Sequence, residues 1–69
     1  MTGRVEQYFE TRGFGFIVVE GGSDIYFHAS GIVVVNGSKP YFLTGDKVSF
    51  DIGEHKGRRI AMNIKKLPN

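Results

Sequence analysis

The sequence predicts a small all-β barrel of five short strands, and three features support this fold class. Apolar residues alternate with polar ones in short blocks, turn residues separate the blocks, and no segment has sustained helical periodicity. Ten glycines in 69 residues can supply the tight turns. Five strands at this spacing are typical of a small barrel, and a chain of this length is expected to form one domain, residues 1–69.

The first three strands are expected in the first half of the chain, separated by two runs of turn residues. A strand within residues 4–9 ends at Glu10-Thr11-Arg12-Gly13, and a second strand over residues 14–20 ends at Gly21-Gly22-Ser23-Asp24. The third strand covers residues 25–29. Both turns contain glycine beside polar residues, which favours chain reversal.

A long connection over residues 30–44 is expected between the third and fourth strands, with Asn36-Gly37 inside it as a hairpin signal. The fourth strand covers residues 47–52, and residues 53–57 are predicted to form a turn. The last strand runs from Arg58 or Arg59 to Lys66. Alternate residues of both late strands are apolar, so each can contribute to one core.

Alternation assigns each side chain of a strand to the inner or the outer face of the barrel. The predicted interior is mainly aliphatic and consists of Ile17, Val19, Ile25, Phe27, Val48, Phe50, Ile52, Ile60, Met62 and Ile64. The second and third strands therefore already have an apolar inner face. Their remaining ring side chains are left on the outside, namely Phe14, Phe16, Tyr26 and His28.

An exposed cluster of four rings predicts a binding surface, because large contiguous apolar patches usually mark binding sites. Every nucleic-acid base has a π-face, so single-stranded RNA or DNA is a suitable ligand, at about 1–3 kcal/mol per stacked base. Duplex is a poor ligand, since its bases are already stacked. The alternative interpretation is that the rings only pair across the strands and stabilise the sheet.

Charge gives this prediction limited support. The formal net charge is +2, which excludes a polycationic tail, but five basic residues crowd residues 56–66 in the last third of the chain. They are Lys56, Arg58, Arg59, Lys65 and Lys66. They allow a local positive patch for phosphates, and the alternative is an ordinary solvated surface.

Two motifs contain these rings: Arg12-Gly13-Phe14-Gly15-Phe16-Ile17 and Asp24-Ile25-Tyr26-Phe27-His28-Ala29-Ser30. They are similar to the RNP1 and RNP2 motifs, respectively, of the cold-shock domain family. Gly3-Arg4-Val5 and Gly45-Asp46-Lys47-Val48-Ser49-Phe50 resemble its opening and its fourth strand, so the likeness covers nearly the whole chain. It implies a five-stranded antiparallel OB-fold barrel that binds single-stranded nucleic acid without metal. It also implies a role as an RNA chaperone or a regulator of transcription or translation.

The resemblance also implies roles for individual residues. Four rings match the family's stacking positions: Phe14, Phe16, Tyr26 and His28. Three further residues match two basic residues and a polar contact: Arg4, Arg12 and Asp24. Arg58 stands where the family has proline, and there it could contact a phosphate.

The chain departs from the family pattern at three positions of the expected surface. Gln7 replaces a stacking tryptophan, Glu6 replaces a lysine, and Ala29 replaces the last ring of RNP2. At about 1–3 kcal/mol per stacked base, two lost rings would weaken binding by a factor of about a hundred or more. Four other rings are candidates to substitute for them: Tyr8, Phe9, Tyr41 and Phe42.

The sequence does not predict an enzyme, and it assigns no catalytic residue, metal or cofactor. His28 and His55 lack the spacing of metal ligands, and the seven acidic residues are scattered. An RNA-recognition-motif domain is set aside because it needs two helices, for which no stretch is suited. The absence of cysteine favours a cytoplasmic location, and no apolar stretch is long enough to cross a bilayer.

The long connection suggests an alternative function for the chain, namely protein–protein interaction. Ile32-Val33-Val34-Val35 and Tyr41-Phe42-Leu43 flank Asn36-Gly37 and have no family counterpart that we identify. They could form an extra hairpin that packs on another copy or a partner, or they could fold onto the open end of the barrel. A monomer is expected, with a dimer through the Ile32–Leu43 connection as the alternative.

Overall fold

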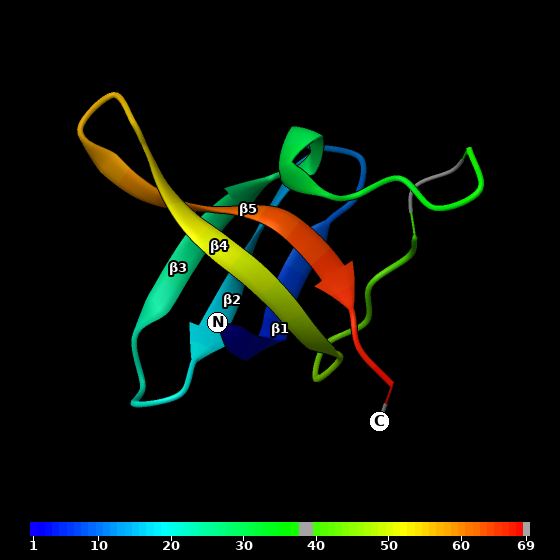
Figure 1. The fold of residues 1–69 in the computed structure, drawn as a ribbon, viewed down its shortest axis with the longest axis horizontal. Helices are drawn as coiled ribbons and strands as arrows, with labels where there is room; N and C mark the ends of the chain where they lie inside the picture. Colours follow the sequence, from blue (N-terminus) through cyan, green and yellow to red (C-terminus); the bar gives the residue numbers. More distant parts are fainter. Residues whose placement is uncertain (38–39, 69) are drawn as a thin grey trace.

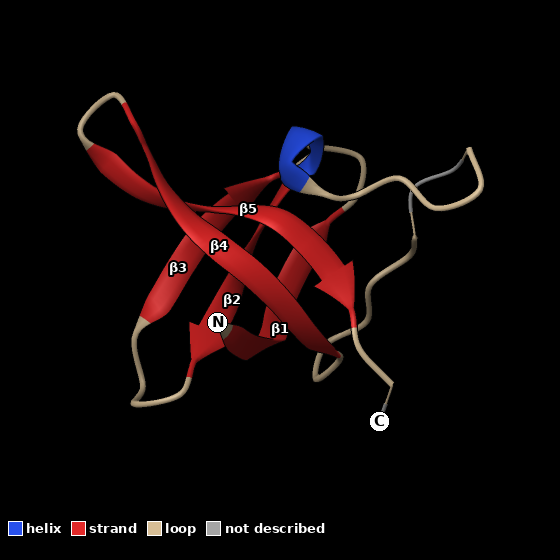
Figure 2. Cartoon of the chain, in the orientation of Figure 1, coloured by secondary structure: helices blue, strands red, loops and turns tan. Residues whose placement is uncertain are grey.

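A computed structural model of the chain describes residues 1–37 and 40–68 (Figure 1). Its elements are β1 (Thr2–Phe9), β2 (Phe14–Val19), β3 (Asp24–His28), the 3-10 helix η1 (Ala29–Gly31), β4 (Lys47–His55) and β5 (Arg58–Lys66). Figure 2 shows that strands dominate and that the short helical turn directly follows β3. Within the described part of the chain, no helix is long and apolar enough to span a membrane.

The strands close into a barrel in the order β1-β2-β3-β5-β4, which confirms the predicted fold class. β1 pairs antiparallel with β2 on one side and with β4 on the other. One pair differs from the wholly antiparallel prediction, because β3 and β5 run parallel through Tyr26–Ile60 and Phe27–Ala61. The long connection after η1 brings β4 antiparallel to β1, so that β5 returns in the direction of β3.

The interior holds the inward side chains of all five strands and two residues of the connection, Ile32 and Phe42. The buried set is Val5, Ile17, Ile25, Phe27, Ile32, Phe42, Val48, Phe50, Ala61 and Ile64. Alternation therefore assigned the inner faces of β2, β3 and β4 correctly. Gly15 also faces inward, and the Phe27 ring occupies the space beside it. An added Cβ would lie 2.7 Å from Phe27 Cζ, so only glycine fits there without displacement.

Two β-bulges, one in β5 and one in β1, reset the alternation of inward and outward side chains. β5 has one more residue than β4 between the pairs Asp51–Met62 and Ser49–Lys65, and Asn63 has a φ of 53°. This bulge leaves Ala61 and Ile64 inside but turns Met62 outward, at 38% exposure. The predictions that Ile60 and Met62 belong to the interior were therefore wrong, because Ala61 between them faces inward and Ile60 also lies outside the core cluster.

A second bulge lies at Glu6 in β1. Val5 pairs with Ile17 and Gln7 pairs with Phe16, so β1 takes two steps where β2 takes one. Val5 and Tyr8 consequently share the inner face, whereas Gln7 and Phe9 share the outer face. The bulged backbone is held by the chain that enters β4, since Thr44 Oγ1 donates a hydrogen bond to the Glu6 carbonyl at 3.1 Å.

The β4–β5 hairpin is longer than predicted. Strand pairing continues to His55–Arg58, so residues 53–55 belong to β4 rather than to a turn. The reversal is confined to Lys56 and Gly57, which have φ values of 53° and 78°, as a tight two-residue hairpin turn requires. The hairpin therefore extends beyond the barrel and carries basic residues on its last strand (Figure 1).

Candidate nucleic-acid interface

The outward side chains of β2 and β3 form one surface, which we call the ring face: Phe14, Phe16, Tyr26 and His28. Strand register aligns them in two rows, because Phe14 pairs with His28 and Phe16 pairs with Tyr26. The residues between them, Gly15 and Phe27, are buried. Strand geometry alone thus brings together all four rings that the sequence predicted to lie outside.

The rings of the two strands contact one another. Phe14 and Tyr26 stack with centroids 5.8 Å apart and planes inclined by 28°, and Phe16 meets Tyr26 edge-on at 5.9 Å. The centroids of Phe14 and Phe16 are 6.2 Å apart at 88°. Phe14, Phe16 and Tyr26 are half-buried and lie outside the core cluster. Each ring is therefore supported by its neighbours while part of its surface stays open to solvent.

His28 ends the ring face in a defined orientation. Its imidazole is exposed, and its Nδ1 accepts a hydrogen bond from the Ser30 backbone N–H at 3.1 Å, with the Ser30 hydroxyl 2.9 Å away. This contact caps η1. Because Nδ1 accepts from the backbone, the neutral ring carries its proton on Nε2. The imidazole can therefore stack on a base or donate a hydrogen bond to it.

Arg12 lies in the turn that joins β1 to β2, directly before the ring face. Its backbone N–H donates to the Phe9 carbonyl at 3.0 Å, and the Gly13 N–H donates to the same oxygen at 2.8 Å. Gly13 has a φ of 77°, which a residue with a Cβ rarely adopts. The turn is thus well defined, and the exposed Arg12 side chain places a positive charge at this end of the rings.

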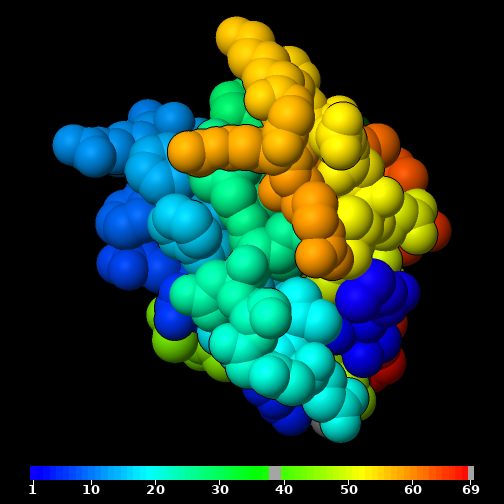
Figure 3. All heavy atoms as spheres, turned by 90° about the vertical axis from the view of Figure 1, so that its left-hand side faces the viewer, coloured from blue at the N-terminus to red at the C-terminus, as the bar shows by residue number. Residues whose placement is uncertain are grey.

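A groove of about 440 Å³ borders the ring face between the β2–β3 turn and the β4–β5 hairpin. Phe16 and Tyr26 line it on one side, Arg58 and Arg59 line it from the hairpin, and Asp24 lies at its edge. Figure 3 shows this side of the barrel, with the hairpin in orange beside β2 and β3 in cyan to green. The predicted Arg58 thus joins the rings. Arg59 was not selected from the sequence, although the adjacent Arg58-Arg59 pair was the available signal.

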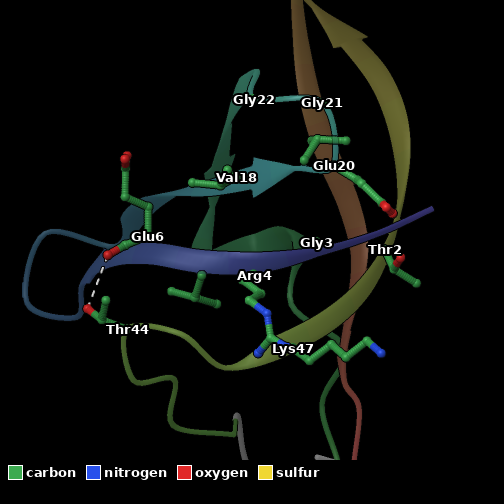
Figure 4. A pocket seen from close by; sticks show the side chains of 12 residues that line it. Thr2, Gly3, Arg4, Glu6, Val18, Glu20, Gly21, Gly22, Thr44 and Lys47 are labelled. Atoms are coloured by element: carbon green, nitrogen blue, oxygen red, sulfur yellow. Dashed lines mark hydrogen bonds between the residues drawn. The ribbon is translucent and has the colours of Figure 1, made fainter.

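Arg4 lies apart from the ring face. Its guanidinium Nη1 donates to the Gly45 carbonyl at 2.9 Å, at the edge where β1 meets β4. Figure 4 shows Arg4 directed towards Lys47, on the opposite side of β1 from Val18. Both residues line a pocket of about 690 Å³ at this edge. The structure therefore does not bring the predicted Arg4 together with the rings.

Two acidic residues lie close together beside β2. The negative charge of Asp24 is the main reason that the pKa of Glu6 is raised above its usual value, with desolvation and a side-chain hydrogen bond to Asp24 as smaller causes. Both side chains are exposed. Glu6 and Asp24 therefore add negative charge at the end of the surface where Arg58 and Arg59 also line the groove, whereas Arg12 lies at the other end.

The four candidate substitute rings have different positions. Tyr8 faces inward, with its ring centroid 5.6 Å from Phe27 and 6.0 Å from Phe42, and burial raises its pKa. Phe42 is 3% exposed and belongs to the core, whereas Tyr41 is 60% exposed on the connection. Phe9 alone of these four contacts the ring face, with its centroid 5.0 Å from that of Phe14.

The connection after η1 exposes several apolar side chains. Val34, Val35, Tyr41 and Leu43 are 52%, 54%, 60% and 57% exposed, whereas Ile32 is buried. Asn36 and Gly37 have φ values of 51° and 80°, as the predicted hairpin turn requires. Residues 38–39 of the predicted Ile32–Leu43 dimer segment lie outside the described residues.

Comparisons with known proteins agree with this architecture. The model of the "Cold-shock" DNA-binding domain family matches residues 1–67. The chain is 39% identical to "Cold shock-like protein CspE" of Bacillus anthracis over 67 residues, 97% of each chain. It is 40% identical to "Cold shock-like protein CspB" of Bacillus cereus over 67 residues, covering 97% of this chain and 100% of the relative. It is 42% identical to "Major cold shock protein" of Streptococcus pyogenes over 65 residues, 94% of each chain.

Proposed function

The chain belongs to the cold-shock domain family, whose members bind nucleic acid, and from that premise we propose that it binds single-stranded RNA or DNA on the ring face. One observation carries the proposal. The rings of Phe14, Phe16 and Tyr26 form a mutually supported cluster outside the core, on strands whose inner face is filled by other residues. A surface of this kind suits unpaired bases, which can stack on the exposed parts of the rings.

Each residue of the site has a physical role in this proposal. The rings stack on bases, while Arg12 and Arg58 neutralise phosphates at the two ends of the ring face. Asp24 can accept hydrogen bonds from base amino groups, and His28 can donate from Nε2. Arg4 stays a predicted phosphate contact, at a separate edge of β1.

The proposed binding needs no chemistry, cofactor or resident metal. None of the relatives named above is described as an enzyme, and the family is a nucleic-acid-binding one. The proposal extends to a role as an RNA chaperone or a regulator of transcription or translation, acting in the cytoplasm as a monomer. Keeping RNA single-stranded requires only reversible stacking and charge neutralisation, which the ring face supplies.

The test is a titration of the protein with fluorescent oligo-dT and oligo-U at two salt concentrations. We expect saturable binding that weakens with salt, with a log–log slope of about −0.7 per neutralised phosphate. Unlabelled double-stranded DNA should compete poorly, because its bases are not available for stacking. Absence of binding at high micromolar protein and low salt would rule the proposal out.

A second candidate function is protein–protein interaction through the connection, favoured by the exposure of Val34, Tyr41 and Leu43. It predicts a molar mass that rises with protein concentration, or capture of a partner, without oligonucleotide binding. A concentration-independent monomer mass in light scattering would count against self-association.

A further inference from the structure

The bulge at Glu6 decides which side chains of β1 face solvent. Without the extra residue, Val5, Gln7 and Phe9 would share the inner face and Tyr8 would point outward. With it, Tyr8 packs against Phe27 inside, and Phe9 pairs with Phe14 on the outside. The hydrogen bond from Thr44 Oγ1 to the Glu6 carbonyl is drawn in Figure 4. Gly45 adds a second bond, from its N–H to the Val5 carbonyl at 2.7 Å. The bulge is therefore held by two consecutive residues of the segment that enters β4.

Phe9 joins the end of the ring face at a fixed position. Its centroid is 5.0 Å from that of Phe14, with the planes inclined by 40°, and its ring is half-buried. Its carbonyl accepts the N–H groups of both Arg12 and Gly13, which ties its backbone to the β1–β2 turn. Phe14 also pairs with His28 on its other side. Phe9, Phe14 and His28 thus form one continuous row across three strands, with Arg12 at its corner.

The neighbouring row is incomplete at the same strand. Gln7 pairs with Phe16, which pairs with Tyr26, so this row ends on β1 in an exposed amide instead of a ring. The aromatic surface of β1 is therefore found beside the β1–β2 turn and not in the middle of the face. The acidic Glu6 also lies on the Gln7 side, whereas the cationic Arg12 lies on the Phe9 side.

We propose that Phe9 is a base-stacking residue of the interface and forms, with Arg12, an additional nucleotide subsite at the β1–β2 end of the ring face. The inference rests on the proposed function and deepens it. It means that the bound strand reaches over the β1–β2 turn, with a base on the Phe9 ring and a phosphate beside the Arg12 guanidinium. The ligand is a single-stranded oligonucleotide, since only an unpaired base can lie flat on such a ring.

The first test compares Phe9→Ala, Phe9→Leu and the matched control Gln7→Ala, which alters the same strand and face at a position without a ring. With oligo-dT at low salt, both Phe9 variants should bind about five- to 150-fold more weakly, the range for one stacked base. Gln7→Ala should stay within about threefold of the parent protein. Phe9→Leu keeps apolar bulk against Phe14, so it should fold even if Phe9→Ala does not.

A second test uses tryptophan as a direct reporter, because the chain contains none. Phe9→Trp should bind oligo-dT at least as well as the parent, and its indole fluorescence should be quenched at saturation by the stacked base. Val34→Trp, at a position 52% exposed on the connection, should show no quenching. Equal responses at both positions would overturn the proposed subsite.

The outcomes separate this inference from the proposed function. If the parent binds and Phe14→Ala weakens binding while Phe9→Leu does not, the ring face is correct and the Phe9 subsite is wrong. If the folded parent does not bind any oligonucleotide, the proposed function itself is wrong. Loss of binding in Gln7→Ala equal to that in Phe9→Leu would also overturn the inference, because the effect would then belong to β1 as a whole.

Discussion

The inner and outer surfaces of β2 and β3 are made from alternate residues of the same strands and differ in what their side chains contact. On the inside, Ile17 and Phe27 are fully buried, and Gly15 leaves the space that the Phe27 ring fills. On the outside, the half-buried rings of Phe16 and Tyr26 contact each other and Phe14. Aromatic side chains therefore lie on both faces of these strands. The inner ring of Phe27 belongs to the core, and the outer rings of Phe16 and Tyr26 do not.

This difference separates a structural ring from a proposed binding ring on one strand. An inner ring is surrounded by side chains from several strands, and its removal leaves a cavity. An outer ring touches only its neighbours in the sheet, so its removal exposes little that was buried. Phe27 and Tyr26 are adjacent in sequence and fall into opposite classes. Inner rings should therefore act on stability and outer rings on binding, and a variant of each kind tests this.

Removal of the inner ring should have the largest effect. We expect Phe27→Ala to destabilise the fold by about 3–5 kcal/mol, because it empties the centre of the core. A domain of this size has a net stability of about 3–5 kcal/mol, so the variant should be largely unfolded at 25 °C. Circular dichroism with urea titration measures this. A variant that unfolds at the parent's urea concentration would show that Phe27 is not a structural ring.

Removal of an outer ring should affect binding instead. We expect Phe14→Ala and Phe16→Ala each to weaken oligonucleotide binding by about 1–3 kcal/mol, with little unfolding. Fluorescence titration and urea titration of the same variants separate the two properties. Val34→Ala is the matched control, since it removes an exposed apolar side chain from the connection. Normal binding by either outer-ring variant would mean that the ring face is assigned wrongly.

Local alternation was sufficient to predict the inner and outer surfaces of β2 and β3. These two strands pair along their whole described register without a shift, so a period of two assigns every side chain. The chain order of the strands and the position of the Gly13 and Gly21 turns also follow from short-range signals. The four outer rings were therefore predictable as a group.

The features that the sequence did not predict depend on residues far apart in the chain. The bulge at Glu6 is held by Thr44, and the bulge at Asn63 is opposite β4, where the Asn63 amide donates to Asp51 at 2.9 Å. Neither partner can be identified from local periodicity. For this reason the outward position of Phe9, the exposure of Met62 and the core position of Tyr8 were not predicted.

Addition of a ring to the outer surface should have the opposite effect on binding. We expect Gln7→Trp or Ala29→Phe to strengthen oligonucleotide binding by about tenfold, near the lower end of the value of one stacked base. Gln7 pairs with Phe16 on the outside, and Ala29 directly follows His28. Titration of each variant against the parent measures the gain. Unchanged affinity in both would mean that other rings already occupy these subsites.

The smallest expected effect concerns the charge of Glu6 at the edge of the outer surface. Asp24 raises the pKa of Glu6, so the folded chain takes up this proton at a higher pH than the unfolded chain does. Acidification through that pKa therefore removes a charge that opposes both folding and the approach of phosphates. We expect Glu6→Gln to bind oligo-dT about two- to fivefold more tightly at neutral pH and low salt.

The pH dependence of this gain identifies its cause. The advantage of Glu6→Gln over the parent should shrink as pH falls through the raised pKa, because the parent then becomes neutral at the same position. An advantage that stays constant into acid would show that Glu6 acts on the ligand through shape or hydrogen bonding, not through its charge.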